Sequence, residues 1–227
     1  MSMPMYVPPE QLVKDRAEFA MKGIGRGRPI AAVQYDNGVL LFGENPSSTL
    51  HKIGEIYDRI AFAAVGRFNE FESLRVAGVR YADVKGYNYG RTDVTARGLA
   101  NGYAQTLGQI FIHEVKPYEV AVVIAEVGDS PADDVMYRVQ FDGTLIDVQH
   151  FTALGGSEET LLEMLAESFE EGAPLADVLA RTAAAIATND ESEIAPERWE
   201  AAVLDRTLGR RRFRRLDTVE IAAAIDA

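Results

Sequence analysis

Residues 18–71 read EFAMKGIGRGRPIAAVQYDNGVLLFGENPSSTLHKIGEIYDRIAFAAVGRFNEF, and this stretch decides the fold. Its first two apolar runs, Ile30–Tyr35 and Val39–Phe42, flank Asp36-Asn37-Gly38, a short turn whose residues tolerate positive φ; this pattern predicts a β-hairpin. A second pair of apolar runs around a polar turn follows within residues 53–65. Four β segments are therefore expected before the first long helix.

Upstream of the hairpin, residues Gln11 to Met21 have the spacing of a short amphipathic helix. Pro8-Pro9 suits the start of that helix, where the N–H that proline lacks would have no intrahelical partner. The spacing predicts that Leu12, Phe19 and Ala20 face inward.

Downstream, the period of the apolar residues changes several times without a linker-like interruption. Strands and helices then come in blocks, which favours antiparallel sheets covered by helix pairs over an alternating parallel fold. The expected class is α+β, a four-layer αββα sandwich of two antiparallel sheets between helix pairs. The predicted elements are helices at 67–84 and from Thr92-Asp93 to about 113, strands at 120–127, 135–141 and 145–148, helices at 157–169 and 174–188, and strands at 199–205 and 212–216.

The composition narrows the classes of protein before any site is considered. The chain has 227 residues, 47% of them hydrophobic, which is enough for one large domain with a filled core. No apolar run of about 18 residues is present, and the N-terminus lacks the features of a signal peptide, so a cytoplasmic protein without a membrane anchor is expected. The net charge of −12 argues against nucleic-acid binding, and the basic run at 210–215 is too short to change this.

Metal and thiol chemistry are not expected either. The chain has no cysteine and only three histidines, His51, His113 and His150, which do not have the spacing of metal ligands. We therefore expect neither a metal nor a cofactor.

The motifs within residues 18–66 resemble the proteasome α-subunit family. The resemblance covers nearly the whole chain and implies the fold of proteasome subunits and other N-terminal nucleophile hydrolases. The proline-rich start and arginine-rich end are most similar to the actinobacterial branch. The motifs are Glu18-Phe19-Ala20, Gly27, Asn37-Gly38-Val39-Leu40-Leu41, Thr49-Leu50-His51-Lys52-Ile53 and Ala64-Val65-Gly66.

The resemblance implies a single domain over residues 1–227. Its parts would be an N-terminal gate segment at 1–9, an N-terminal helix at 10–22, the sandwich at 30–216 and a C-terminal tail at 217–227.

The resemblance also implies that this chain has no catalytic residues. Catalytic relatives need an N-terminal hydroxyl nucleophile whose own α-amine is the base, with a lysine and an aspartate nearby. Placing Gly38 on the hairpin glycine of a β subunit sets Arg28 at the nucleophile position, Glu44 near the aspartate, and Ser47 or Ser48 near the lysine. All three roles are then vacant or altered.

Lys52 is the main candidate for a binding site. In the family, a lysine directly before the strand that begins at Ile53 lies in a pocket between neighbouring α subunits and can bind the C-terminal carboxylate of a docking activator. An ammonium on a long stem suits a carboxylate that arrives and leaves. Gly66 and Arg67 match the opposite wall of that pocket, although family members often carry an apolar residue in place of Arg67. Taken alone, a lysine at a strand start is usually a solvated edge charge.

The first residues match the position of the family's gate, where seven N-termini close the axial pore. In this chain Tyr6 is followed by Val7 and Pro8, which departs from the widespread Tyr-Asp-Arg gate motif. The alternative interpretation is a frayed terminus. The residues assigned to the gate are Met1, Ser2, Met3, Pro4, Met5, Tyr6, Val7 and Pro8.

The function implied is that of a non-catalytic α subunit of the 20S proteasome core particle. Such subunits form homo-heptameric outer rings, scaffold the proteasome β subunits and restrict the entry of unfolded protein substrates. Their activator would be a ring-shaped ATPase that docks through its C-terminal residues and, in the actinobacterial case, delivers proteins marked with a small protein tag. The proteolytic activity would lie in the β subunits.

Two alternatives stay open. The chain could be an active N-terminal nucleophile hydrolase with an unrecognised processing site; Thr49 is the nearest candidate, but cutting there would remove the first hairpin. It could also be a stand-alone binding protein on the same fold.

Overall fold

The computed structural model describes residues 8–189 and 194–226, in which ten strands form two five-stranded sheets. The strand order is β10-β9-β2-β1-β8 in one sheet, here called sheet A, and β3-β4-β5-β6-β7 in the other, sheet B. All the strand pairings described are antiparallel. The strands are β1 Ile30–Tyr35, β2 Gly38–Glu44, β3 Ile53–Tyr57, β4 Ile60–Gly66, β5 Val120–Glu126, β6 Val135–Val139, β7 Leu145–Val148, β8 Phe151–Leu154, β9 Trp199–Asp205 and β10 Phe213–Arg215.

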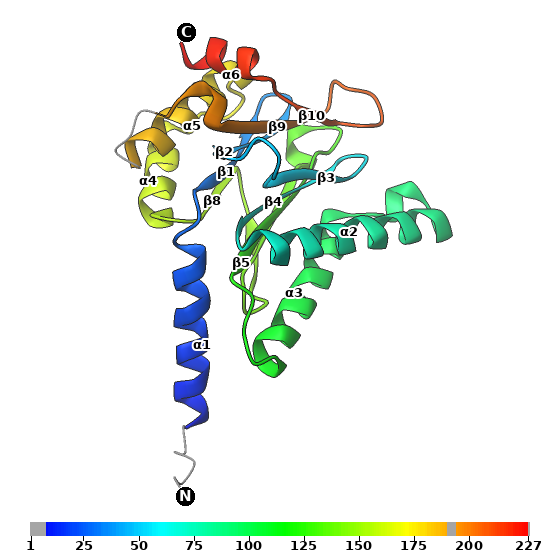
Figure 1. Ribbon diagram of the computed structural model, residues 1–227. Helices are drawn as coiled ribbons and strands as arrows, with labels where there is room; N and C mark the ends of the chain where they lie inside the picture. Colours follow the sequence, from blue (N-terminus) through cyan, green and yellow to red (C-terminus); the bar gives the residue numbers. More distant parts are fainter. Residues whose placement is uncertain (1–7, 190–193, 227) are drawn as a thin grey trace, which may run out of the picture.

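Helices cover the outer face of both sheets (Figure 1). Helices α4, α5 and α6 lie on sheet A, and α2 and α3 lie on sheet B. This arrangement confirms the predicted α+β sandwich of two antiparallel sheets between helices. The helices are α1 Pro9–Ile24, α2 Phe68–Asn88, α3 Ala96–His113, α4 Glu158–Ser168, α5 Leu175–Asn189 and α6 Thr218–Ile225, with short 3₁₀ turns at Arg91–Asp93, Pro131–Asp133 and Pro196–Arg198.

Three buried clusters fill the spaces between the layers. Along β2, Leu41 faces the layer between the sheets, whereas Leu40 and Phe42 face the helices on sheet A. Because successive side chains of a strand point to opposite faces, a strand covered on both sides needs apolar residues at every position. The continuous apolar runs of the sequence therefore reflect burial on both faces.

Two elements were not predicted from the sequence. Strand β8 is only four residues long and completes sheet A by pairing with β1, directly after His150, which has a φ of 59°. Helix α6 forms where a C-terminal tail at 217–227 was expected. Asp217 and Glu220 exchange hydrogen bonds at its start in a reciprocal capping box, which satisfies two N–H groups of the first turn.

Helix α1 extends away from the sandwich, and its first residues lie far from the C-terminus (Figure 1). The expected inward orientation of Leu12 and Phe19 was wrong, because these side chains are 49% and 48% exposed in the single chain. Only Ala20 and Ile24 of α1 are buried, near its C-terminal end. Among the described residues, about half of the surface of Leu12, Val13, Phe19 and Met21 of α1 is therefore left uncovered. Across the described residues, no helix combines the length and apolar character needed to cross a membrane.

Candidate functional site

Lys52 lies directly before β3, and its side chain reaches across the end of the inter-sheet layer to sheet A. Its Nζ donates to the carbonyl oxygens of Arg28 (3.2 Å) and Glu44 (3.0 Å). An ammonium has three N–H donors, so these two carbonyls leave one donor for a ligand. This geometry suits an approaching carboxylate.

Burial lowers the pKa of Lys52 from 10.5 to about 8. The carboxylates of Glu200 and Glu44 oppose this shift, and the guanidinium of Arg28 adds to it. The ammonium is therefore mostly charged at neutral pH, but much less strongly so than that of a solvated lysine. A strongly perturbed pKa together with specific charged neighbours is typical of functional sites.

Glu44 connects this lysine to two arginines. Its carboxylate is only 1% exposed and is paired with Arg28 (Nη1 to Oε2, 3.3 Å) and with the guanidinium of Arg198. The structure thus brings together Arg28 and Glu44, the residues assigned to the nucleophile and aspartate positions, with Lys52.

Ser47 and Ser48, the residues expected near the lysine position, lie in the loop before β3, and it is Lys52 that contacts the carbonyl of Arg28. Ser47 instead accepts hydrogen bonds through Oγ from the amides of Thr49 (3.4 Å) and Leu50 (3.0 Å), within the loop before β3. Counting residues from Gly38 overlooks this loop, which brings Lys52 back beside Arg28. A lysine and a carboxylate are thus in place, but residue 28 has no hydroxyl and its nitrogen lies in a peptide bond, so Arg28 cannot act as an N-terminal nucleophile.

Gly66 lies at the same end of the sandwich as Lys52, because β3 and β4 pair antiparallel and the amide of Ala64 donates to the carbonyl of Lys52 (3.1 Å). Gly66 has a φ of 124°, and a Cβ there would fall 1.9 Å from the carbonyl oxygen of Glu119. Only glycine therefore permits this close approach of β4 to the chain before β5.

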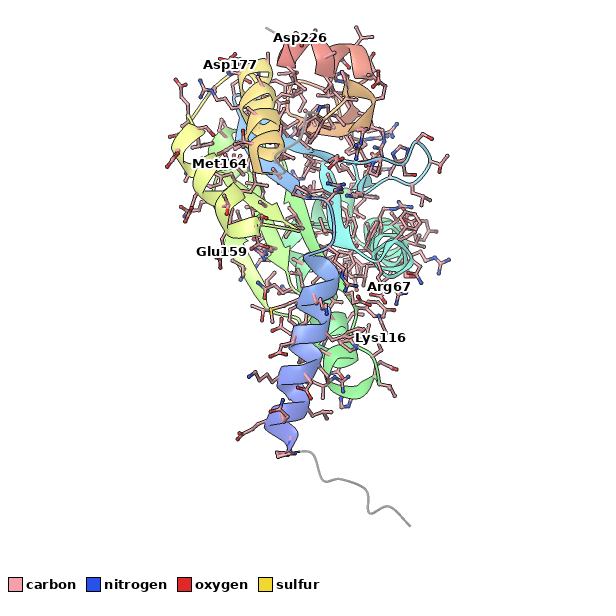
Figure 2. All side chains as sticks on the ribbon, turned by 60° about the vertical axis from the view of Figure 1, so that its left-hand side comes forward. Arg67, Lys116, Glu159, Met164, Asp177 and Asp226 are labelled. Carbon is pink, nitrogen blue, oxygen red and sulfur yellow. The ribbon has the colours of Figure 1, made fainter. Side chains whose placement is uncertain are left out.

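The side chain of Arg67 points to a different group of charges. Its Nη1 lies 3.5 Å from Glu119, whose carboxylate also accepts from Lys116 (2.9 Å), and Lys116 contacts Glu70 (2.6 Å). Figure 2 shows Arg67 and Lys116 near one another beside α1. Arg67 directly follows Gly66 in the chain, but its guanidinium pairs with Glu119 in this second cluster and not with a residue around Lys52.

The residues assigned to the gate lie mostly outside the described part of the chain. Of them, the structure describes only Pro8, which is exposed and whose carbonyl accepts the first hydrogen bond of α1 from the amide of Leu12 (3.1 Å). The other seven, Met1 to Val7, lie outside the described residues.

The arginines of the basic run at 210–215 pair with acidic residues of other segments. Arg211 binds Glu55 (2.5 Å), and Arg212 binds Asp129 (2.5 Å). Arg215 binds Glu200 (2.9 Å).

Glu200 is the site residue that sequence reasoning missed. It lies in β9 with only 8% exposure, and its Oε2 accepts from the amide of Lys52 (3.0 Å). The signal that could have found it is a carboxylate inside an apolar strand, since acidic residues are almost never fully buried without partners.

Comparisons with known proteins agree on one family. The model of the family described as "Proteasome subunit" matches residues 24–204. A protein from Kineococcus radiotolerans named "Proteasome subunit alpha" is 53% identical over 233 residues, covering 99% of this chain and 98% of the relative. Proteins of the same name from Nocardioides sp. (56% over 220 residues, 95% of this chain and 86% of the relative) and Thermobifida fusca (50% over 224 residues, 98% and 90%) are also similar. These relatives are actinobacterial, in agreement with the predicted branch.

Proposed function

The chain belongs to the proteasome subunit family, and from that premise we propose that it is an α-type subunit of a 20S core particle that performs no chemistry itself. Seven copies would form each outer ring, stacked on rings of β subunits that carry the threonine-protease activity. The ring would restrict the entry of unfolded substrates and bind a ring-shaped ATPase that delivers proteins marked with a small protein tag.

The observation that carries this proposal is the arrangement around Lys52. The site has a charged lysine with one N–H donor to spare and a buried carboxylate, Glu44, but no nucleophile at residue 28. Such a site can bind a carboxylate and cannot cleave a peptide bond. The C-terminal carboxylate of an activator is the ligand that fits it.

Replacing Lys52 tests the docking role. Lys52→Met keeps most of the aliphatic stem and removes the charge, so it should abolish stimulation of peptide hydrolysis by the activator in particles assembled with β subunits of the same organism. The native mass of the particle should not change. Normal stimulation of the Lys52→Met particle would refute the docking role, whereas loss of assembly would be seen directly in the mass.

The gate is tested by removing Met1 to Pro8, which should speed the entry and hydrolysis of small peptides in the assembled particle. The same truncation supplies the control for Lys52→Met: once entry is unrestricted, the β subunits should hydrolyse peptides at the same rate with either residue at position 52. Unchanged hydrolysis after truncation would contradict a gate.

Ring formation is supported by the exposed apolar side chains of α1, which a neighbouring subunit could cover. They are Leu12, Val13, Phe19 and Met21. Native mass spectrometry of the chain co-expressed with its β subunit should give α chains in multiples of seven. A monomer that ignores β subunits would instead support a stand-alone binding protein.

A further inference from the structure

The carboxylate of Glu200 accepts hydrogen bonds from several groups in and around the segment that carries Lys52. Its Oε2 accepts from the amide of Lys52 (3.0 Å) and from the side-chain Nδ2 of Asn45 (2.7 Å). Its Oε1 accepts from the amide of Ile53 (3.2 Å) and lies 3.3 Å from Nδ1 of His51. One side chain of sheet A thus binds two consecutive amides at the start of a strand of sheet B.

Glu200 is in turn locked in place by its neighbours. Arg215 on β10 donates to Oε1 of Glu200 (2.9 Å) and also to the carbonyl of Ile53, so it clamps the same strand start. Asn45 donates to the carbonyl of Leu50 (2.7 Å) as well as to Glu200, which ties the loop before Lys52 to the same carboxylate. The position of the Lys52 main chain therefore depends on Glu200 rather than on the loop alone.

We propose that Glu200 is the positioning residue of the docking site. It fixes the main chain at residues 52 and 53, so that the Lys52 ammonium reaches the carbonyls of Arg28 and Glu44. One N–H donor of the ammonium is then left for an incoming carboxylate. The inference rests on the docking role proposed for Lys52. A long side chain that is held at both ends loses little conformational entropy on binding, so preorganisation of this kind raises affinity. Glu200 need not touch the ligand to have this effect.

Glu200 has a second effect, on the charge of the lysine. The charged groups that act on Lys52 are Glu200 from β9, Glu44 from β2 and Arg28 before β1, and His51 lies 3.3 Å from Glu200. Of these, Glu200 does most to favour the ammonium against its burial. Removing the carboxylate charge should therefore lower the pKa of Lys52 below its present value of about 8, a change that loss of local order alone would not produce.

Glu200→Gln, in the full-length chain assembled with its β subunits, tests both effects. The probe is a short fluorescent peptide that copies the C-terminus of the ring ATPase of the same organism, with a free α-carboxylate; its C-terminally amidated form reports binding that does not depend on the carboxylate. The matched control is Glu126→Gln. Glu126 is also a buried strand carboxylate that accepts a backbone amide (Ala96, 2.7 Å) and pairs with an arginine (Arg59, 2.9 Å), but it lies at the other end of sheet B.

At about pH 7, Glu200→Gln should bind the free-carboxylate peptide roughly tenfold more weakly than the wild-type particle, and the pH at which binding is half lost should move to a lower value. Glu126→Gln should leave both quantities unchanged. If Glu200→Gln behaves like Glu126→Gln while Lys52→Met loses binding, the inference about Glu200 is wrong and the docking role of Lys52 stands. If Lys52→Met binds normally, the docking role fails and the inference fails with it.

Glu200→Asp covers the case in which Glu200→Gln does not assemble. Its shorter side chain keeps the negative charge but cannot reach both amides, so affinity should fall while the half-loss pH stays at the wild-type value. Wild-type affinity in Glu200→Asp would overturn the positioning role.

Discussion

Raising the pH from about 7 to about 9 should release the activator peptide, because the Lys52 ammonium titrates in this interval. A base with a pKa of about 8 is about 90% charged at the lower pH and about 10% charged at the higher one, so affinity that depends on the ammonium should fall about tenfold. With an ordinary pKa of 10.5 the same change of pH would leave affinity almost constant. The size of the loss of affinity therefore measures how far burial lowers the pKa of Lys52.

The assay is the binding of the fluorescent free-carboxylate peptide to assembled wild-type particles, followed by anisotropy over this pH interval. Calorimetry in buffers of different ionisation enthalpy should also show that binding above about pH 8 takes up a proton, since a bound carboxylate stabilises the ammonium. Lys52→Arg is the control, because a guanidinium stays charged throughout and any residual binding should not depend on pH. Constant wild-type affinity between about pH 7 and 9 would refute the assigned environment of Lys52.

Three further predictions concern the scaffold. Tyr103→Phe should raise the free energy of unfolding in urea by about 1 kcal/mol, because the buried Tyr103 hydroxyl has no hydrogen-bond partner among the described residues; a clear loss of stability would contradict this. Gly78→Ala should lower the free energy of unfolding by roughly 2 kcal/mol, because its Cβ would fall 1.7 Å from that hydroxyl. The loss of stability should be smaller in a Tyr103→Phe background, and equal losses in both backgrounds would refute the clash. Asp217→Ala should lower the local stability of α6 by about 1 kcal/mol, because it removes the cap to the amide of Glu220 (2.8 Å). The measurement is hydrogen exchange, which should become faster in α6 alone, and unchanged exchange would show that the cap is dispensable.

The parts of the fold that the sequence predicts well depend on local signals. The hairpin at Gly38 is an example, since its φ of 155° and the 1.8 Å approach that a Cβ would make to the carbonyl of Leu204 both require glycine. Strands β1, β2, β4 and β5 were also predicted, because burial on both faces produces continuous apolar runs. Such signals lie within a few residues of the element they specify.

Most of the parts that the sequence did not predict depend on partners far along the chain. Strand β8 has only four residues and exists because Ala153 pairs with Ala31 of β1. Helix α6 is the exception, because its capping pair, Asp217 and Glu220, is a local signal within the helix itself. A carboxylate inside the apolar β9 marks Glu200 as unusual, but its partner, the amide of Lys52, lies 148 positions away and no local pattern identifies it.

The same few residues support the proposal that the site binds a ligand without cleaving it. The chain continues without a break from α1 through Gly27 into Arg28. Gly27 packs closely against its neighbours: a Cβ there would fall 2.2 Å from Val65, and its carbonyl accepts from the amide of Gly156 (3.1 Å). The nitrogen of residue 28 is thus a peptide nitrogen and not a free amine, so the neighbouring lysine has no base to assist. Lys52 binds the carbonyl of Arg28 instead, and this bond holds its remaining donor ready for a ligand from outside. A substitution that freed Lys52 from this carbonyl should therefore weaken docking without creating catalysis.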